Sequence, residues 1–188
     1  MSMDYYIYLK DTKQFSIQSF EQYCHTLGLS ITVYPSFNFA ENFGFLPMRL
    51  IDTRFATDGE SNAYLSGFEM YSSEYRHTIP EPKKPSGFFR KLFKPQPVEE
   101  SPFDKAVEDA STLVSMRCSS ADSFEILLAY VFGAYLVKHC DGVFDDPQIG
   151  QFYNVSKHIE IEIETIISEL QSAAAAGELL THEFKEWL

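Results

Sequence analysis

The stretch from Ser123 to His139 is the feature that most constrains how this chain can fold. Asp122 can cap a helix there, with Glu125 answering from the third helical position, and the helix must end before Asp141-Gly142. Its apolar positions are Ile126, Leu127, Leu128, Val131, Phe132, Leu136 and Val137. These side chains point to almost every side of a helix, so we expect a central helix that other elements must surround.

This helix is too short in its apolar part to cross a membrane. The uncharged, mainly apolar run of this helix, Ile126–Val137, has 12 residues, whereas a membrane-spanning helix needs about 20. A buried core helix is therefore the expected structure.

The first 35 residues predict a strand, a helix and a second strand. Residues 4–10 are rich in Tyr and Ile, which favours a strand with an aromatic face. Ser16 can cap the helix, whose apolar side chains recur at helical spacing, and Gly28 can end it in the left-handed conformation. The β-branched run at residues 30–34 predicts the second strand.

The centre of the chain predicts an irregular segment followed by two paired strands. Residues 36–50 contain many apolar side chains but hold no period, so we expect packed, irregular backbone. Residues 64–71 resume strand character, and Gly67 within them indicates a bulge or a close backbone approach. Residues 111–118 alternate as a half-buried strand does and should pair antiparallel with residues 64–71.

A basic, proline-rich insert at about residues 78–102 connects these two strands. It holds six of the nine prolines of the chain. Its basic and aromatic side chains include Lys83, Lys84, Phe88, Phe89, Arg90, Lys91, Phe93 and Lys94. Three interpretations stay open: a weakly ordered loop, an amphipathic segment that touches a membrane surface or an anionic polymer, and packing against the acidic body or a second copy.

The C-terminal third predicts a short strand and amphipathic helices. Val143-Phe144 favours a strand that ends in a turn at residues 145–148. A helical segment at about residues 156–188 begins at Ser156, breaks at Gly177 and resumes as a short final helix. We therefore expect one α+β domain over residues 1–188, with a mixed, mainly antiparallel sheet, the buried central helix, and the amphipathic C-terminal helices packed on the sheet.

Charge and cysteine content limit the function classes. The chain has 15 basic and 27 acidic residues, a formal charge of −12, which argues against general binding to nucleic acids or anionic membranes. Without the five charges of the insert, ten basic residues face 27 acidic ones, a charge of −17. Three scattered cysteines imply neither a disulfide framework nor a zinc site, and the N-terminus has no secretory signal, so we expect a cytoplasmic protein with a basic partner.

No pattern in the sequence predicts a catalytic, metal or cofactor site. The familiar nucleotide, hydrolase and metalloprotease motifs are absent from the sequence. The pairs Cys24-His25 and His139-Cys140 are neighbours in helices, where adjacent side chains point about 100° apart. Asp141, Asp145 and Asp146 have oxygens that suit a hard cation, but Asp-Gly and Asp-Pro are also ordinary turn sequences.

Three short blocks carry a family resemblance. They are Gly44-Phe45-Leu46-Pro47, Ser66-Gly67-Phe68-Glu69-Met70-Tyr71, and residues 141–148 (DGVFDDPQ). Their order resembles that of small bacterial immunity proteins of polymorphic toxin systems, over roughly residues 4–154. The resemblance implies a protein that protects the producing cell from a toxin delivered between bacteria. The block residues are markers of the fold, and the basic insert and the acidic C-terminal helix depart from the family pattern.

The leading hypothesis is therefore an immunity-type protein that neutralises a basic toxin through an acidic surface. The residues expected to bind the partner are Asp145, Asp146, Glu160, Glu164 and Tyr153, with Tyr5 as another aromatic anchor. Glu160 and Glu164 lie one helical turn apart with no lysine expected nearby, a repulsion that a basic partner would relieve. Two alternatives remain, an adaptor recruited through the basic insert and an unrecognised enzyme, and the sequence leaves the oligomeric state open.

Overall fold

The computed structural model describes residues 2–39, 41, 43–56, 62–78, 101–119 and 121–181. The expected central helix, α3, spans Ser123–His139, and every residue from Leu127 to Val137 is buried. Its first turn is capped by Asp122, which accepts a hydrogen bond from the backbone N–H of Phe124 at 2.8 Å. The helix contacts two other helices and four strands, which explains its apolar character on all sides.

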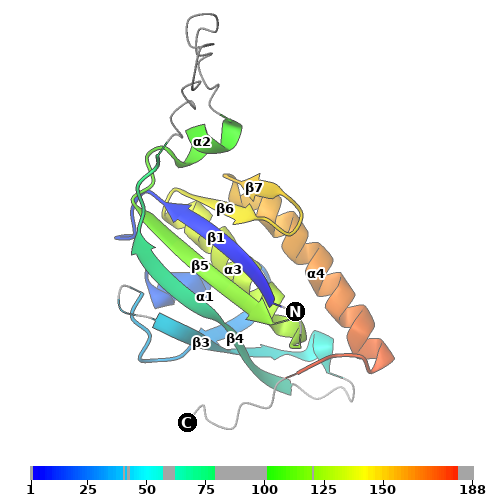
Figure 1. Ribbon diagram of the computed structural model, residues 1–188. Helices are drawn as coiled ribbons and strands as arrows, with labels where there is room; N and C mark the ends of the chain where they lie inside the picture. The colour runs from blue at the N-terminus through cyan, green and yellow to red at the C-terminus, as the bar shows by residue number, and fades with distance from the viewer. Residues whose placement is uncertain are drawn as a thin grey trace, which may run out of the picture.

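The other elements surround α3 (Figure 1). In chain order they are β1 (Ser2–Leu9), α1 (Ile17–Thr26), β2 (Ser30–Val33), β3 (Phe43–Asp52), the 3-10 turn η1 (Thr53–Phe55), β4 (Asn62–Glu74), α2 (Pro102–Val107), β5 (Thr112–Ser119), α3, β6 (Gly142–Asp146), β7 (Gln151–Tyr153) and α4 (Ser156–Ala176). The strand, helix and strand predicted at the N-terminus are confirmed as β1, α1 and β2.

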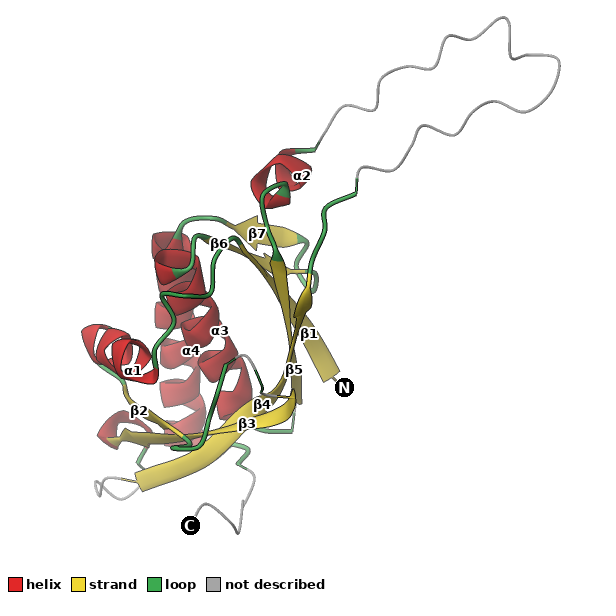
Figure 2. Ribbon diagram, turned by 90° about the vertical axis from the view of Figure 1, so that its left-hand side faces the viewer, coloured by secondary structure: helices red, strands yellow, loops and turns green. Residues whose placement is uncertain are grey.

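The strands form one sheet in the order β2-β3-β4-β5-β1-β6-β7. Each pairing among the described strands is antiparallel, so the α+β class is confirmed and the expected mixture of directions is not seen in this part of the chain. The sheet curves around α3, with α1 and α4 on the same side (Figure 2). We call this side the inner face and the opposite side the outer face.

The inner face carries the main core. On β1, for example, Tyr5, Ile7 and Leu9 point inward and are buried, because side chains alternate between the two faces of a strand. A smaller apolar cluster forms on the outer face, where Val107 of α2 packs with Val143 of β6 and Tyr8 of β1. None of the helices in the described ranges is long and apolar enough to cross a bilayer.

Three predictions of local structure were wrong. Part of the segment expected to be irregular is the regular strand β3, paired with β4 over ten residues from Phe43↔Tyr71 to Asp52↔Asn62. Asp145 and Asp146 belong to β6, so the turn begins only at Pro147. Pro102, assigned to the insert, is the first residue of α2, where the missing N–H of proline costs no hydrogen bond.

The predicted end of the last long helix is confirmed. Gly177 adopts φ +71° after Ala176, and its N–H bonds back to the carbonyl of Ala174. Residues 178–181 are not helical, and the rest of the expected final helix, residues 182–188, lies outside the described residues. Most of the basic insert, residues 79–100, also lies outside them.

Candidate binding surface

The outer face of the sheet exposes large aromatic side chains on β3. Leu46, Met48 and Leu50 point inward into the core, so the alternate residues of the same strand point outward. Phe43 is 84% exposed and Phe45 is 38% exposed. The Phe43 ring packs edge-on against Tyr71 of β4, with 4.8 Å between ring centroids. Exposed aromatic side chains of this size are common anchors in protein interfaces.

A row of charged side chains runs across the sheet beside these aromatics. The strand register places Phe45 opposite Glu69, Glu69 opposite Arg117, and Arg117 opposite Asp4. Arg117 Nε donates to Asp4 Oδ1 at 2.8 Å, and this hydrogen bond raises the pKa of Arg117. The Tyr71 hydroxyl donates to Glu69 Oε2 at 3.3 Å. Across the sheet, Phe45 therefore lies at one end of this row, and the ion pair of Arg117 with Asp4 lies at the other.

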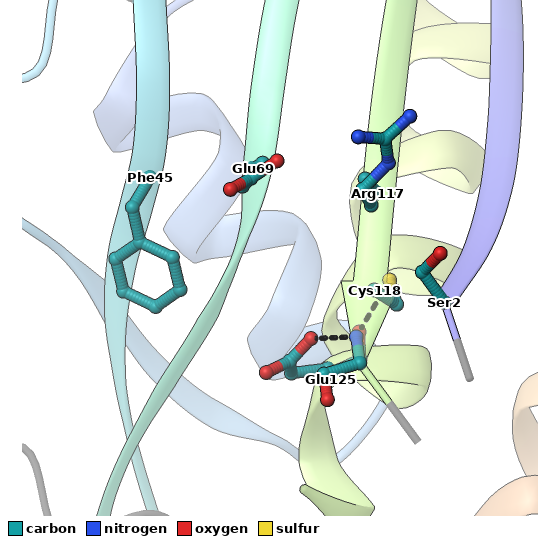
Figure 3. Close-up of a pocket in the computed structure, with 7 residues that line it drawn as sticks. Ser2, Phe45, Glu69, Arg117, Cys118 and Glu125 are labelled. Carbon is teal, nitrogen blue, oxygen red and sulfur yellow. Dashed lines mark hydrogen bonds between the residues drawn. The ribbon is translucent and has the colours of Figure 1, made fainter. Parts of the chain in front are cut away.

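A hollow of about 190 Å³ opens at this row. The pairing of β4 with β5 ends at Glu69↔Arg117, and the two strands separate beyond it. The residues that line the hollow are Ser2, Phe45, Glu69, Arg117, Cys118, Ser119 and Glu125. Figure 3 shows Phe45, Glu69 and Arg117 on three neighbouring strands, with Glu125 below them and the Arg117 guanidinium pointing away from Glu125.

Contacts at the start of α3 hold Glu125 at the base of the hollow. Ser66 Oγ of β4 donates to Asp122 Oδ1 at 2.9 Å, which ties the N-terminal cap of α3 to the sheet. Glu125 is 5% exposed, and its carboxylate accepts a hydrogen bond from the backbone N–H of Ser119. The buried Cys118 thiol donates to the Glu125 carbonyl at 3.6 Å, and burial raises the pKa of this thiol. A neutral thiol is a poor nucleophile, so the role that fits Cys118 is packing.

Gly67 allows β3 and β4 to meet closely beside the hollow. Its φ is +157°, and an added Cβ would lie 2.1 Å from the Leu46 carbonyl oxygen and 2.8 Å from Cζ of Phe45. The close backbone approach predicted at Gly67 is thus confirmed. The first two blocks of the family resemblance form this contact, because the register pairs Pro47 with Gly67 and Phe45 with Glu69.

The structure separates the residues predicted to bind the partner. Asp146 is 2% exposed and points inward, where its carboxylate accepts hydrogen bonds from the Tyr130 hydroxyl and from the backbone N–H of Gln148. Tyr153 and Tyr5 are also buried, so they are not the exposed aromatics that were expected. Asp145 is half-buried on the opposite face from Asp146, and burial raises its pKa, with the Asp146 charge adding to the effect.

The two glutamates on α4 differ in their surroundings. Glu160 Oε1 accepts from the Tyr23 hydroxyl of α1 at 3.0 Å, and Glu160 Oε2 lies 3.3 Å from Lys157 Nζ. The expectation that no lysine lies near Glu160 was therefore wrong. Glu164, one turn later, is exposed.

The remaining candidate groups do not converge in the described residues. The Cys24 and Cys140 thiols are buried, while Asp141 is exposed and forms an ion pair with Lys10 at 3.2 Å. No group of three or more His, Cys, Asp or Glu side chains in the described ranges is arranged to hold a metal ion. The basic insert residues Lys83, Lys84, Phe88, Phe89, Arg90, Lys91, Phe93 and Lys94 lie outside those ranges.

Sequence reasoning missed the outer face because β3 carries large apolar side chains on both sides, with Arg49 as the charged exception on the outer side. Phe43, Phe45 and Ile51 point outward while Leu46, Met48 and Leu50 point inward, so the two-residue alternation is hidden. The signal that could have found the strand is the pair of blocks at residues 44–47 and 66–71. Comparison of the chain with protein-family models, with curated proteins and with solved structures gave no match in any of the three.

Proposed function

We propose that this protein is a cytoplasmic immunity-type protein that binds and neutralises a toxin delivered between bacteria. The observation that supports this most is the outer face, where exposed Phe43 and Phe45 lie beside the charge row of Glu69 and Arg117. Interface hot spots combine such aromatic anchors with desolvated charged groups. The binding surface proposed is thus this outer face, in place of the residues that the sequence suggested, of which Asp146 and Tyr153 are buried.

The partner proposed is a basic protein domain. The chain carries a formal charge of −12, and −17 without the five basic residues of the insert. A body with this charge attracts a basic domain over a distance and speeds its association. The acidic side of α4, which includes Glu162 and Glu164, then contributes to steering, while the outer face makes the contact.

The first experiment asks whether the chain neutralises a toxin at all. The chain is expressed together with the toxin domain encoded by the neighbouring gene, and growth is measured along with complex formation by size-exclusion chromatography. We expect rescued growth and a stable complex. Growth arrest together with separate elution of the two proteins would exclude the immunity function.

A second experiment locates the surface. Phe43→Ala removes an exposed anchor of the outer face, and Ile161→Ala removes a comparable exposed apolar side chain from α4. Binding to the toxin, measured by calorimetry, should weaken by about 1 kcal/mol or more in the first variant, at least about fivefold, and should stay unchanged in the second. The reverse result would move the interface to α4.

The alternative function, an adaptor recruited through the basic insert, makes a different prediction. To test it, residues 82–97 are replaced by a Gly-Ser linker in a variant that keeps Tyr75 and Phe103, which pack against Tyr8 of β1 on both sides of the insert. We expect this variant to neutralise the toxin as well as the parent does. If the variant loses its localisation or recruitment but still neutralises the toxin, the chain has an adaptor role in addition to the immunity function. If the variant no longer neutralises the toxin, the insert is the binding surface and the outer face is not.

A further inference from the structure

The hollow beside Phe45 has three kinds of wall. One wall is the aromatic ring of Phe45, a second is the pair of carboxylates Glu69 and Glu125, and a third is formed by the small side chains of Ser2 and Ser119. Among the described residues that line the hollow, Arg117 is the one cation, and its Nε donates a hydrogen bond at 2.8 Å to Asp4, which is not a lining residue. Asp4 therefore offsets part of the charge that Arg117 brings to the hollow and to Glu69, and the described lining holds two carboxylates for one cation.

We infer that this hollow receives the guanidinium group of an arginine on the partner protein, stacked on Phe45 and paired with Glu69. The inference rests on the proposed function, because it names the group by which the partner's basic surface would anchor on the outer face. Arginine is also among the residues most often found at interface hot spots.

The shape and chemistry of the walls favour arginine over lysine. A guanidinium is planar, so it can stack on the Phe45 ring while its N–H groups donate to a carboxylate at the edge of that ring. Glu69 is the residue directly opposite Phe45 on the neighbouring strand, which places an acceptor beside the ring. A lysine ammonium is a compact, strongly hydrated charge and gains less from a flat aromatic wall.

Glu125 adds an acceptor at the base of the hollow. Its carboxylate is held by the Ser119 N–H, and α3 is held by the link from Asp122 to Ser66, so the group is positioned before any partner arrives. A carboxylate can accept about four hydrogen bonds in total. A preorganised acceptor of this kind lowers the entropic cost of binding.

The test uses N-acetylarginine amide as the probe and N-acetylcitrulline amide as its neutral isostere. Each is titrated into the ¹⁵N-labelled full chain in the millimolar range, and backbone amide signals are followed by NMR. We expect the arginine probe to move the signals of Phe45, Glu69 and Ser119, and the citrulline probe to leave them in place. Equal shifts with both probes, shifts confined to α4, or no shifts would overturn the assignment.

Variants assign the contribution of each wall. Glu69→Gln and Phe45→Leu should each weaken binding of the arginine probe at least about threefold, whereas Glu164→Gln, on exposed α4, should not change it. The chemical-shift dispersion of the NMR spectrum shows whether each variant is folded. If a variant does not fold, the titrations of the parent chain with the two probes still test the proposal. Unchanged probe affinity in folded Glu69→Gln would overturn the assignment.

Two other occupants give distinct results. If the same signals shift with chain concentration in the absence of probe, the occupant of the hollow is a second copy of the chain. If replacement of residues 82–97 tightens probe binding, the occupant is the chain's own insert. Either result overturns the assignment to a partner. The outcome is also separable from that of the proposed function. A chain that neutralises the toxin but does not bind the probe keeps its function and loses this inference.

Discussion

At the scale of single residues, Gly67 determines whether β3 and β4 can meet at the edge of the hollow. A side chain at this position would collide with backbone of the neighbouring strand, and its φ of +157° is one that L side chains rarely adopt. Gly44, on β3, also has a positive φ, +117°, but an added Cβ there meets nothing within 4 Å. The two glycines separate the effect of backbone strain from the effect of close contact.

Replacing each glycine by alanine should therefore give different losses of stability. Gly67→Ala is expected to lower the free energy of unfolding by about 3 kcal/mol or more, because strain and collision add. Gly44→Ala, with strain alone, should cost about 1 kcal/mol. Urea denaturation of the two variants measures the difference. Equal losses would mean that β3 moves away at no cost and that the close approach is unimportant.

At the scale of elements, the acidic helix α4 combines a structural glutamate with exposed ones. Glu160 joins α4 to α1 through the Tyr23 hydroxyl, and Tyr23 also lies under Lys138, with 5.0 Å between the Lys138 Nζ and the ring centroid. Burial and the Glu160 charge both raise the pKa of Tyr23, so this hydroxyl stays protonated and donates. Glu164 is exposed on the same helix.

Alanine at these two positions tests this division. Glu160→Ala should lower the free energy of unfolding by about 1–2 kcal/mol, because the buried Tyr23 hydroxyl loses its acceptor. Glu164→Ala should stay within about 0.5 kcal/mol of the parent. Both variants gain the same helix propensity, so the comparison isolates the contact. A loss of stability at Glu164 equal to that at Glu160 would contradict the structural role.

At the scale of the whole molecule, the helices and the outer face have different proposed tasks. The acidic residues of α4 lie on a helix at the inner face of the sheet (Figure 2). The exposed aromatic side chains Phe43 and Phe45 lie on the outer face. Long-range attraction depends on total charge, whereas the contact depends on the local surface. Charge and contact residues should therefore affect different rate constants.

The kinetics of toxin binding test this separation. Raising the salt concentration from about 50 to 500 mM should slow association about tenfold or more, because a shorter Debye length screens the attraction. Glu162→Gln combined with Glu164→Gln should lower the association rate at low salt, while Phe43→Ala should mainly raise the dissociation rate. Stopped-flow measurements give both constants. An association rate that does not depend on salt would contradict electrostatic steering.

The sequence alone determined the elements whose pattern is local. The cap at Ser16, the left-handed helix end at Gly28, the helix break at Gly177 and the all-round apolar α3 each follow from neighbouring residues, and each was confirmed. The close backbone approach at Gly67 was also predicted, because a glycine inside a strand usually marks a bulge or a close approach of another backbone.

Only the tertiary structure decided which side chains face outward and which meet. The β3 strand has large apolar side chains on both sides, so no local period shows that Phe43 and Phe45 are exposed. Asp145 and Asp146 are neighbours in sequence, yet strand alternation buries one and leaves the other on the opposite face. The hollow depends on the register of four strands and on where β4 and β5 separate, a long-range property that no short segment of sequence encodes.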